Sequence, residues 1–335
     1  MRSEIYAYPI QDSTPAVLRQ EPYPYPRAWT RETLRAEDWR FALPEACLAE
    51  LDAVVEGLRR QPLPTLVLKP RDFALEACAA FMGRIKAALD HGPGMANVER
   101  LPMERYSHAE AGAAYWLLGS LLGRPVAQKW NGLMIYDVMD TGAEHVIGVR
   151  GSVTNSGQNF HTDNSYARMP PQYVGLLCLH PAKEGGMSRV VSWHTVYNEL
   201  LERCPHLLPR AFRPFLYERN CEHPPDEPRV LSKPMMFPGE TLKVCFSTSA
   251  ITDGYEVSGQ ALDAEGEELI AAIRQILADR RLHTDFHFRA GELQFVNNGT
   301  VGHSRTAFRD HPEPERKRHL IRLWFREQGR ISYDG

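Results

Sequence analysis

Cysteine is scarce in this chain, and its cysteines show no paired spacing. Six are scattered along 335 residues with no C-x-x-C pair: Cys47, Cys78, Cys178, Cys204, Cys221 and Cys245. In a chain of this length, scattered cysteines indicate reduced thiols and not a disulfide framework. The sequence therefore predicts a cytoplasmic protein.

Long apolar runs and a basic excess are also missing. The N-terminal residues 1–20 contain no long apolar stretch, which argues against a secretory signal. The most apolar window, residues 111–122, is too short to span a bilayer. The formal net charge of −3 argues against a nucleic-acid partner, because a phosphate backbone calls for a clear basic excess. We expect a small-molecule substrate and no membrane partner, and association into a homo-oligomer stays open.

The N-terminal residues 1–42 show no regular periodicity. They contain a Pro-Tyr run from Pro22 to Pro26, which favours an extended arm lying on the body of the protein. A peptide ligand for another domain is the alternative interpretation. Residues 43–335 contain no internal repeat or low-complexity tract, and we interpret them as one domain.

Three helices are predicted directly after the arm. Residues 44–60 and 72–89 each place their apolar side chains on one stripe at helical spacing. Residues 111–122 are apolar nearly all round, which is typical of a helix buried on most sides. We expect these helices to form a layer against the rest of the domain.

From about Val126 the pattern changes to short strand-like runs separated by Gly, Pro and Asn, which is typical of an all-β barrel or sandwich. The runs cover residues 134–138, 173–179, 188–192, 242–246, 283–288, 293–296 and 320–326. Two helical segments interrupt them, residues 193–203 and residues 263–278, the second within an insert at about 261–280. The sequence predicts a mostly β fold backed by the N-terminal helices.

The sharpest chemical feature is the segment FHTDNSY at residues 160–166. In an extended segment, residues two apart face the same way, so His161 and Asp163 project together while Thr162 points opposite. Two histidines and one carboxylate on one face, with the other positions open, is the ligand set of non-haem Fe(II) oxygenases. An H-x-D segment alone could also be a surface turn, so a metal site requires further ligands elsewhere in the chain.

A third ligand is predicted at His303. The sequence QFVNNGTVGHSR at residues 294–305 contains an Asn-Asn-Gly turn between two strand-like runs, which places His303 on the return strand. Other histidines have no comparable framing, and we interpret most of them as surface or packing residues, among them His145, His180, His194, His223, His283, His287, His311 and His319.

A strand rich in arginine is predicted near the C-terminus. In KRHLIRLWFR at residues 317–326, Arg318, Arg322 and Trp324 share one face. Buried arginines are costly unless anions meet them, and arginine matches a carboxylate with two parallel hydrogen bonds. The distal carboxylate of 2-oxoglutarate is one such anion, and internal salt bridges are the alternative.

Taken together, these motifs resemble the taurine dioxygenase-like family of iron(II)/2-oxoglutarate oxygenases, with kinship to γ-butyrobetaine hydroxylase. The motifs stand in the family's order: the H-x-D segment at 161–163, Gly185-Gly186-Met187-Ser188, His303, and the arginine-rich strand. The resemblance covers roughly residues 125–328. It implies a double-stranded β-helix, or jelly roll, with a cupin-like core.

The resemblance also implies roles for single residues. His161, Asp163 and His303 are similar to the iron ligands. Arg318 matches the arginine that pairs with the C5 carboxylate of 2-oxoglutarate, and Ser188 matches a threonine whose hydroxyl holds the same carboxylate.

Substrate contacts are predicted less sharply. Arg322 matches a position that contacts the substrate's anionic group in taurine dioxygenase, and an internal Asp or Glu is its alternative partner. Asn164 and Tyr166, which follow the H-x-D segment, either line the pocket or pack. Arg305 either faces the pocket or pairs with a carboxylate, and we interpret Asn298 as a turn residue.

The resemblance implies an enzyme that uses Fe(II), 2-oxoglutarate and O2 to oxidise an unactivated C–H bond of a small polar, anionic substrate. Succinate and CO2 are then released, and hydroxylation is the default outcome. Two alternatives remain at this point. One is a metal-dependent isomerase or hydrolase on a cupin-like barrel, which would not need Arg318 or Ser188. The other is a non-catalytic binding barrel.

Overall fold

The computed structural model describes residues 5–7, 18–144, 146–239 and 241–334. The remaining part of the predicted N-terminal arm, residues 1–4 and 8–17, lies outside this description, as does His145. From Leu18 onward the arm contacts the body of the protein. The Trp29 indole, only 1% exposed, donates to the Pro93 carbonyl at 2.9 Å.

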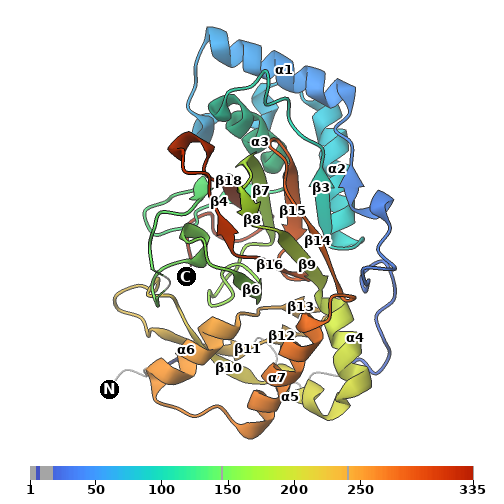
Figure 1. Ribbon diagram of the computed structural model, residues 1–335, viewed down its shortest axis with the longest axis vertical. Coiled ribbons are helices and arrows are strands. Elements are labelled where there is room, and N and C mark those ends of the chain that lie inside the picture. Colours follow the sequence, from blue (N-terminus) through green and yellow to red (C-terminus); the bar gives the residue numbers. More distant parts are fainter. Residues whose placement is uncertain (1–4, 8–17, 145, 240, 335) are drawn as a thin grey trace.

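Two β-sheets face each other at the centre of the molecule (Figure 1). The larger sheet contains, in order, β2 (Arg40–Phe41), β3 (Met95–Val98), β15 (Leu293–Asn297), β7 (Tyr173–His180), β18 (His319–Arg326) and β4 (Arg124–Val126), and β5 (Tyr136–Val138) also pairs with β18. The smaller sheet contains β14 (His283–Phe286), β9 (Ser188–Ser192), β16 (Val301–Arg305) and β6 (Gln158–His161). A short ladder joins β8 (Glu184–Gly185) to β17 (Phe308–Arg309).

Strand alternation determines what each sheet buries. On β18, Trp324 packs with apolar residues of both sheets, including Val190 and Val301 of the smaller one. The neighbouring positions Leu323 and Phe325 point the other way, into the helical layer. This is the period of two expected for a strand buried on both faces, and it leaves Arg318 and Arg322 on the side between the sheets.

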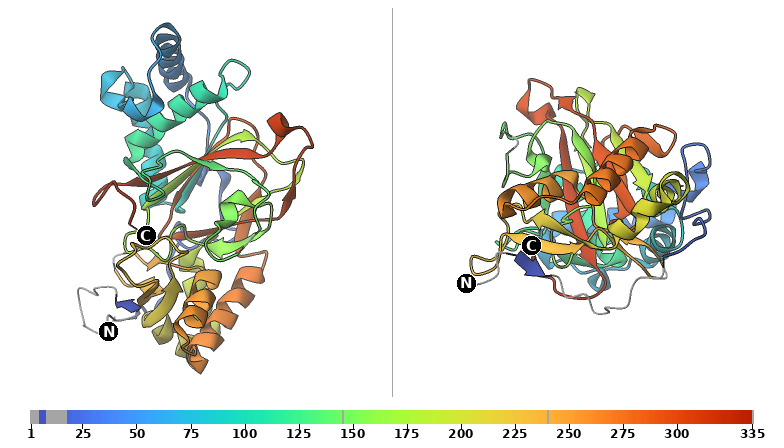
Figure 2. Two further views of the ribbon diagram at one scale, coloured as in Figure 1. Left: turned by 90° about the vertical axis from the view of Figure 1, so that its left-hand side faces the viewer. Right: turned by 90° about the horizontal axis from the view of Figure 1, so that it is seen from below.

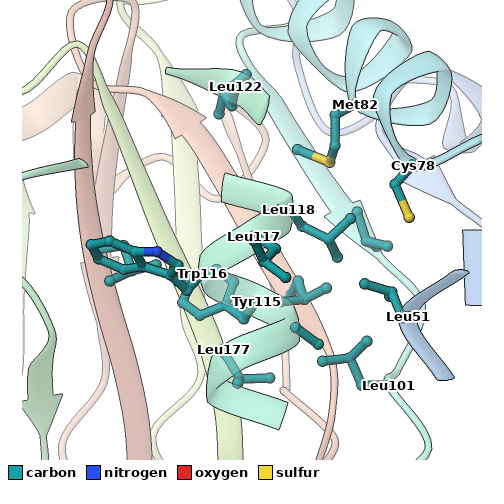
Figure 3. Packing of buried hydrophobic residues seen from close by; sticks show 14 of the residues in the cluster. Leu51, Cys78, Met82, Leu101, Tyr115, Trp116, Leu117, Leu118, Leu122 and Leu177 are labelled. Atoms are coloured by element: carbon teal, nitrogen blue, oxygen red, sulfur yellow. The ribbon is translucent and has the colours of Figure 1, made fainter. Parts of the chain in front are cut away.

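The helical layer covers the outer face of the larger sheet at one end of the molecule (Figures 1 and 2). It consists of α1 (Glu45–Arg60), α2 (Glu76–Asp90) and α3 (His108–Leu122). The third helix begins with a capping box between Ser107 and Glu110 and is buried on nearly all sides, as its composition predicted. Figure 3 shows its residues Tyr115 and Leu118 packed among side chains of the other helices and the sheet.

A second lobe lies at the opposite end of the molecule (Figure 1). Its helices are α4 (Trp193–Arg203), α5 (Leu208–Ala211), α6 (Thr248–Ser258) and α7 (Ala264–Ala278). Its strands are β1 (Ile5–Ala7), β11 (Val230–Pro234) and β10 (Pro214–Glu218), with the separate pair β12 (Met236–Phe237) and β13 (Lys243–Val244). The lobe has its own hydrophobic core around Trp193, Phe215 and Ile273.

The structure refines several expected boundaries. Helix α2 begins at Glu76 and not at residue 72, because Pro70–Asp72 forms a separate 3-10 turn. Only Lys243–Val244 of the expected run 242–246 is a strand, and Arg318 lies just before β18. The other 3-10 turns are Ala36–Asp38, Thr65–Val67, Gly151–Val153, Pro205–Leu207 and Pro314–Arg316. Among the described residues, no helix combines the length and the apolarity needed to cross a membrane.

Candidate active site

Three predicted metal ligands meet between the two sheets. Antiparallel pairing of β6 with β16 places His161 directly opposite His303, with ring centroids 4.5 Å apart. The turn after β6 brings in Asp163, whose Oδ1 lies 3.5 Å from His161 Nε2 and 3.2 Å from His303 Nε2. One ligand atom from each residue lies within 4.8 Å of the others. Two imidazoles and one carboxylate on one side of an ion is the donor set that suits Fe(II) and leaves positions open.

The two imidazoles are prepared for metal binding. His161 Nδ1 lies 2.8 Å from the Asn159 carbonyl, which fixes the tautomer and leaves Nε2 free to bind a metal. Burial, together with neighbouring His161, lowers the pKa of His303. A lowered pKa favours the neutral ring, which is the form that binds metal.

Asp163 is held by two donors that sequence analysis did not assign to it. The Trp324 indole donates to its Oδ2 at 2.7 Å, and Arg322 Nη1 lies 3.1 Å from the same oxygen. These contacts leave Oδ1 turned toward the histidines. Burial alone would raise the pKa of Asp163, but Arg322 and the two histidines hold this pKa well below its usual value. The carboxylate is therefore ionised and oriented before a metal arrives.

Asn298 fixes the backbone of Asp163 through two hydrogen bonds. Its Oδ1 accepts from the Asp163 amide at 2.7 Å, and its Nδ2 donates to the Asp163 carbonyl at 2.9 Å and to the Pro171 carbonyl at 3.1 Å. Asn298 lies in the turn between β15 and β16, as the Asn-Asn-Gly signal predicted. The sequence could not show that the turn side chain reaches the metal ligand.

Replacing Trp324 by phenylalanine should lower the iron affinity of the protein by about 10- to 100-fold, because ligand-orienting hydrogen bonds carry effects of this size. The variant should fold, since the aromatic packing is largely kept. Titration of the apoprotein with Fe(II) under anaerobic conditions measures the change. Trp116→Phe is the matched control, because that buried indole donates to the Leu68 carbonyl at 3.0 Å in the helical layer. Equal affinity in the two variants would contradict the role of Trp324.

A second group of side chains forms a cationic site. Arg318 and Arg305 are 4% and 6% exposed, and both guanidinium groups lie over the Phe308 ring, with Cζ 5.1 and 4.7 Å from its centroid. Among the described residues, no carboxylate forms an ion pair with either one. Arg318 Nη1 and Arg305 Nε and Nη1 are buried without a hydrogen-bond partner in the same part of the chain. Unpaired buried donors are costly, and their number here indicates a site for an anion.

The electrostatics agree with this interpretation. Burial lowers the pKa of Arg318 to about 10. Burial and the nearby charge of Arg318 lower the pKa of Arg305 to about 9. Arginine does not lose its proton at such values in practice, so both groups stay positively charged and lack a compensating anion. A dicarboxylate would supply this anion.

Ser188 and the glycine pair before it complete this cationic site. Ser188 is buried at the start of β9, directly opposite Arg305 in the β9–β16 ladder. Gly186 has φ of 64°, and a Cβ added there would lie 3.3 Å from Arg318 Nε. The glycine therefore provides both the left-handed turn and the space that Arg318 occupies. In the Gly-Gly-Met-Ser motif, the glycine therefore makes room for Arg318, and the serine supplies a hydroxyl group.

One cavity of about 490 Å³ joins the metal ligands to the cationic site. All nine residues that the sequence singled out for the site line it: His161, Asp163, Asn164, Tyr166, Ser188, His303, Arg305, Arg318 and Arg322. The size suits a cosubstrate together with a small substrate.

Arg150 and Glu222, which sequence analysis missed, form an ion pair at the edge of this cavity. Arg150 Nε donates to Glu222 Oε1 at 2.7 Å, and the Tyr166 and Tyr333 hydroxyls also donate to Glu222. Tyr333 additionally contacts Asn164 Oδ1 at 3.3 Å. Both charged residues lie in loops without any motif, so only the fold brings them together.

Arg150 and Arg322 lie beside the same two aromatic rings. Their Cζ atoms are 5.4 and 4.6 Å from the Tyr136 centroid, and 5.5 and 4.7 Å from the Trp324 centroid. Arg322 Nε donates to Gln128 Oε1 at 2.8 Å. Its Nη2 and Arg150 Nη1 have no hydrogen-bond partner among the described residues. Arg322 therefore has an internal Asp as one partner and still one free donor.

Known proteins of similar sequence and structure place the chain in context. FR-33289 synthase from Streptomyces rubellomurinus is 27% identical over 310 residues, covering 90% of each chain. Taurine hydroxylase-like protein SAT17 from Stachybotrys chartarum is 24% identical, covering 88% of this chain and 77% of the relative. Asparagine oxygenase, solved with Fe(II), 3-hydroxyasparagine and succinate, has a TM-score of 0.62 at 18% identity, covering 85% of this chain and 93% of that structure. The non-haem iron oxygenase OrfP, solved with Fe and alpha-ketoglutaric acid, has a TM-score of 0.60 at 14% identity, covering 86% and 94%.

A family match decides the classification. The model of the family described as taurine catabolism dioxygenase TauD, TfdA family matches residues 61–324, which is most of the chain. This match leaves no support for the isomerase, hydrolase or binding-barrel alternatives, and the triad and cationic site fit Fe(II) and 2-oxoglutarate. The chain therefore belongs to the taurine catabolism dioxygenase TauD, TfdA family and is an iron(II)- and 2-oxoglutarate-dependent dioxygenase.

Proposed function

We propose that this dioxygenase oxidises an unactivated C–H bond of a small polar substrate that carries an anionic group, with hydroxylation as the default outcome. The observation that carries the proposal is the pair of free donors, Arg150 Nη1 and Arg322 Nη2, beside the metal ligands. A buried guanidinium with an unmade hydrogen bond favours an anion as partner. A carboxylate, sulfonate or phosphonate would satisfy both groups.

Each end of the cavity has a separate role in this proposal. His161, Asp163 and His303 hold the iron, while Arg318 and Ser188 hold the C5 carboxylate of 2-oxoglutarate. When bound, iron and cosubstrate supply the oxidising chemistry, with succinate and CO2 released. The chain orients the carboxylate ligand through Trp324 and Arg322, excludes bulk water from the buried cationic site, and directs the substrate toward the metal.

Known relatives support the substrate class and the fold. Asparagine oxygenase was solved with 3-hydroxyasparagine and OrfP with hydroxyarginine, which are small molecules that carry a carboxylate. For the fold, we propose that the two facing sheets form the double-stranded β-helix that the motif order implied. Asn164 and Tyr166 lie on the Glu222 side of the cavity, where they would contact the substrate's remaining polar groups.

A substrate survey tests the proposal first. Succinate formation is measured with Fe(II), 2-oxoglutarate and O2 across amino acids, betaines, sulfonates, phosphonates and other carboxylates, each compared with its neutral amide or ester. Anionic members should stimulate turnover and their neutral analogues should not. Stimulation by the neutral analogues alone would overturn the proposed substrate class.

Once a substrate is identified, Arg150→Met should raise the KM for that substrate by about 10- to 100-fold, because a hydrogen bond to a charged group contributes about 1.5–3 kcal/mol. Decarboxylation of 2-oxoglutarate without substrate should persist. Arg150 bonds to Glu222 and to the Gln128 carbonyl, whereas Arg322 pairs with the metal ligand Asp163, so that Arg322→Leu would also disturb the iron site. Glu222→Gln is the matched control, since it removes the carboxylate and keeps the arginine, and it should retain substrate affinity. Equal KM effects in both variants would assign the pair a structural role.

A further inference from the structure

We propose that Arg305 is a second cation for the distal carboxylate of 2-oxoglutarate and that the same guanidinium group fastens the 151–156 turn over the cavity. The 151–156 turn is defined as residues Gly151 to Ser156, which connect Arg150 to β6. The inference rests on the proposed carboxylate site at Arg318, and it adds a positioning role that the family resemblance does not provide.

The three nitrogens of Arg305 divide between two tasks. Its Nη2 donates to three carbonyls of the turn, at 2.9 Å to Thr154, at 3.5 Å to Gly151, and to Ser156. Its Nε and Nη1 are buried and have no partner among the described residues. Nη2 is thus committed to the turn, while the Nε–H and Nη1–H donors remain free for a ligand.

Arg305 and Arg318 line the same cavity. Both guanidinium groups lie over the same Phe308 ring, and Ser188 lies opposite Arg305 in the strand ladder. Two buried like charges repel each other, so this arrangement is unfavourable until an anion lies between them. A carboxylate has two oxygens and can accept from both arginines at once.

The 151–156 turn forms part of the cavity wall and directly follows Arg150. Gly151 and Ser152 line the cavity, and Arg150, the proposed substrate-binding cation, precedes them directly. The Asn155 carbonyl is also bound by the Phe308 amide at 3.1 Å, so the turn is joined to the residue on which both arginines lie. Binding of the cosubstrate carboxylate should therefore order the turn and place Arg150 for the substrate.

The test compares the binding of 2-oxoglutarate with that of one analogue, 2-oxopentanoate, to the full-length Fe(II) protein without oxygen. 2-Oxopentanoate has the same chain length as 2-oxoglutarate but has a methyl group in place of the distal carboxylate. In Arg305→Met, 2-oxoglutarate affinity should fall about tenfold while 2-oxopentanoate affinity stays within about twofold, since only the former loses a charged hydrogen bond. Arg309→Met, an exposed arginine on β17 that pairs with Glu184, is the matched control and should change neither affinity.

Amide hydrogen exchange measures the second half of the proposal. In the Fe(II) protein, 2-oxoglutarate should slow exchange in residues 151–157, and 2-oxopentanoate should not. In Arg305→Met this difference should vanish. If that variant does not fold, Arg305→Lys takes its place. It should lose the protection of the turn while keeping part of the preference for 2-oxoglutarate.

The outcomes separate this inference from the proposed function. If Arg305→Met weakens both oxo acids equally, or leaves both unchanged while Arg318→Met abolishes the preference for 2-oxoglutarate, the role of Arg305 is overturned and the carboxylate site stands. If neither variant alters the preference, the carboxylate site itself is misplaced and both proposals fail. A selective loss in each variant, with turn protection that depends on Arg305, supports the inference.

Discussion

Arg318→Met should raise the Kd for 2-oxoglutarate by about 30- to 5,000-fold, because loss of a buried Arg–carboxylate pair costs about 2–5 kcal/mol. Iron affinity should change little, since Arg318 contacts no metal ligand. Its guanidinium is buried without an ion-pair partner in the described part of the chain. Removing it should therefore leave the free energy of unfolding of the unliganded protein unchanged or increase it. The measurement is a titration with 2-oxoglutarate combined with urea unfolding.

Arg326→Met is the matched control for this prediction. Arg326 lies on the same strand and is 3% exposed, but its guanidinium group is bound to the carbonyls of Met169, Pro170 and Arg330. This variant should lose stability and keep its affinity for 2-oxoglutarate. If Arg318→Met unfolds the protein as Arg326→Met does, Arg318 has a structural role and not a binding role.

Asp163→Ala and His161→Ala should both abolish iron binding, but they should differ in stability without metal. Asp163→Ala strands the buried Arg322 and the Trp324 indole, and breaking a buried ion pair costs about 3–5 kcal/mol. The His161 side chain is 23% exposed, its Nδ1 bonds to the Asn159 carbonyl, and its Nε2 lies 3.5 Å from Asp163 Oδ1. Its loss should cost about 1 kcal/mol or less, as for most substitutions at partly exposed sites.

Urea unfolding of the metal-free variants measures this difference. The double variant Asp163→Ala, Arg322→Leu removes both members of the ion pair and should recover part of the lost stability. Equal stability of the two single variants would mean that Arg322 does not depend on Asp163 for its charge compensation.

The sequence predicted the parts of the site that depend on local rules. Strand alternation placed His161 with Asp163 and placed Arg318 with Arg322, and the Asn-Asn-Gly turn put His303 on a return strand. The structure brings these residues to one cavity and places His303 on β16. Asp163, however, lies in the turn after β6, and Arg318 lies just before β18, so strand alternation alone does not account for their positions. The helices predicted at 44–60, 111–122 and 193–203 are also present, although α3 begins earlier than expected, at His108.

The remaining parts depend on contacts between distant segments. Arg150 meets Glu222 across 72 residues of sequence, and Trp324 meets Asp163 across 161. No local pattern could pair them. Much of the second lobe was also missed, because α6 (Thr248–Ser258) contains glycine and threonine residues that weaken a helical pattern. Its stability comes from packing against the lobe's core.

Anaerobic addition of Fe(II) and 2-oxoglutarate to the apoprotein tests the central claim most directly. Wild-type protein should develop a weak visible charge-transfer band that requires both components. His161→Ala, Asp163→Ala and His303→Ala should lack the band, and Arg318→Met should need far more 2-oxoglutarate to form it. A wild-type protein without the band, or a band that survives in His161→Ala, would contradict the assignment of the iron site.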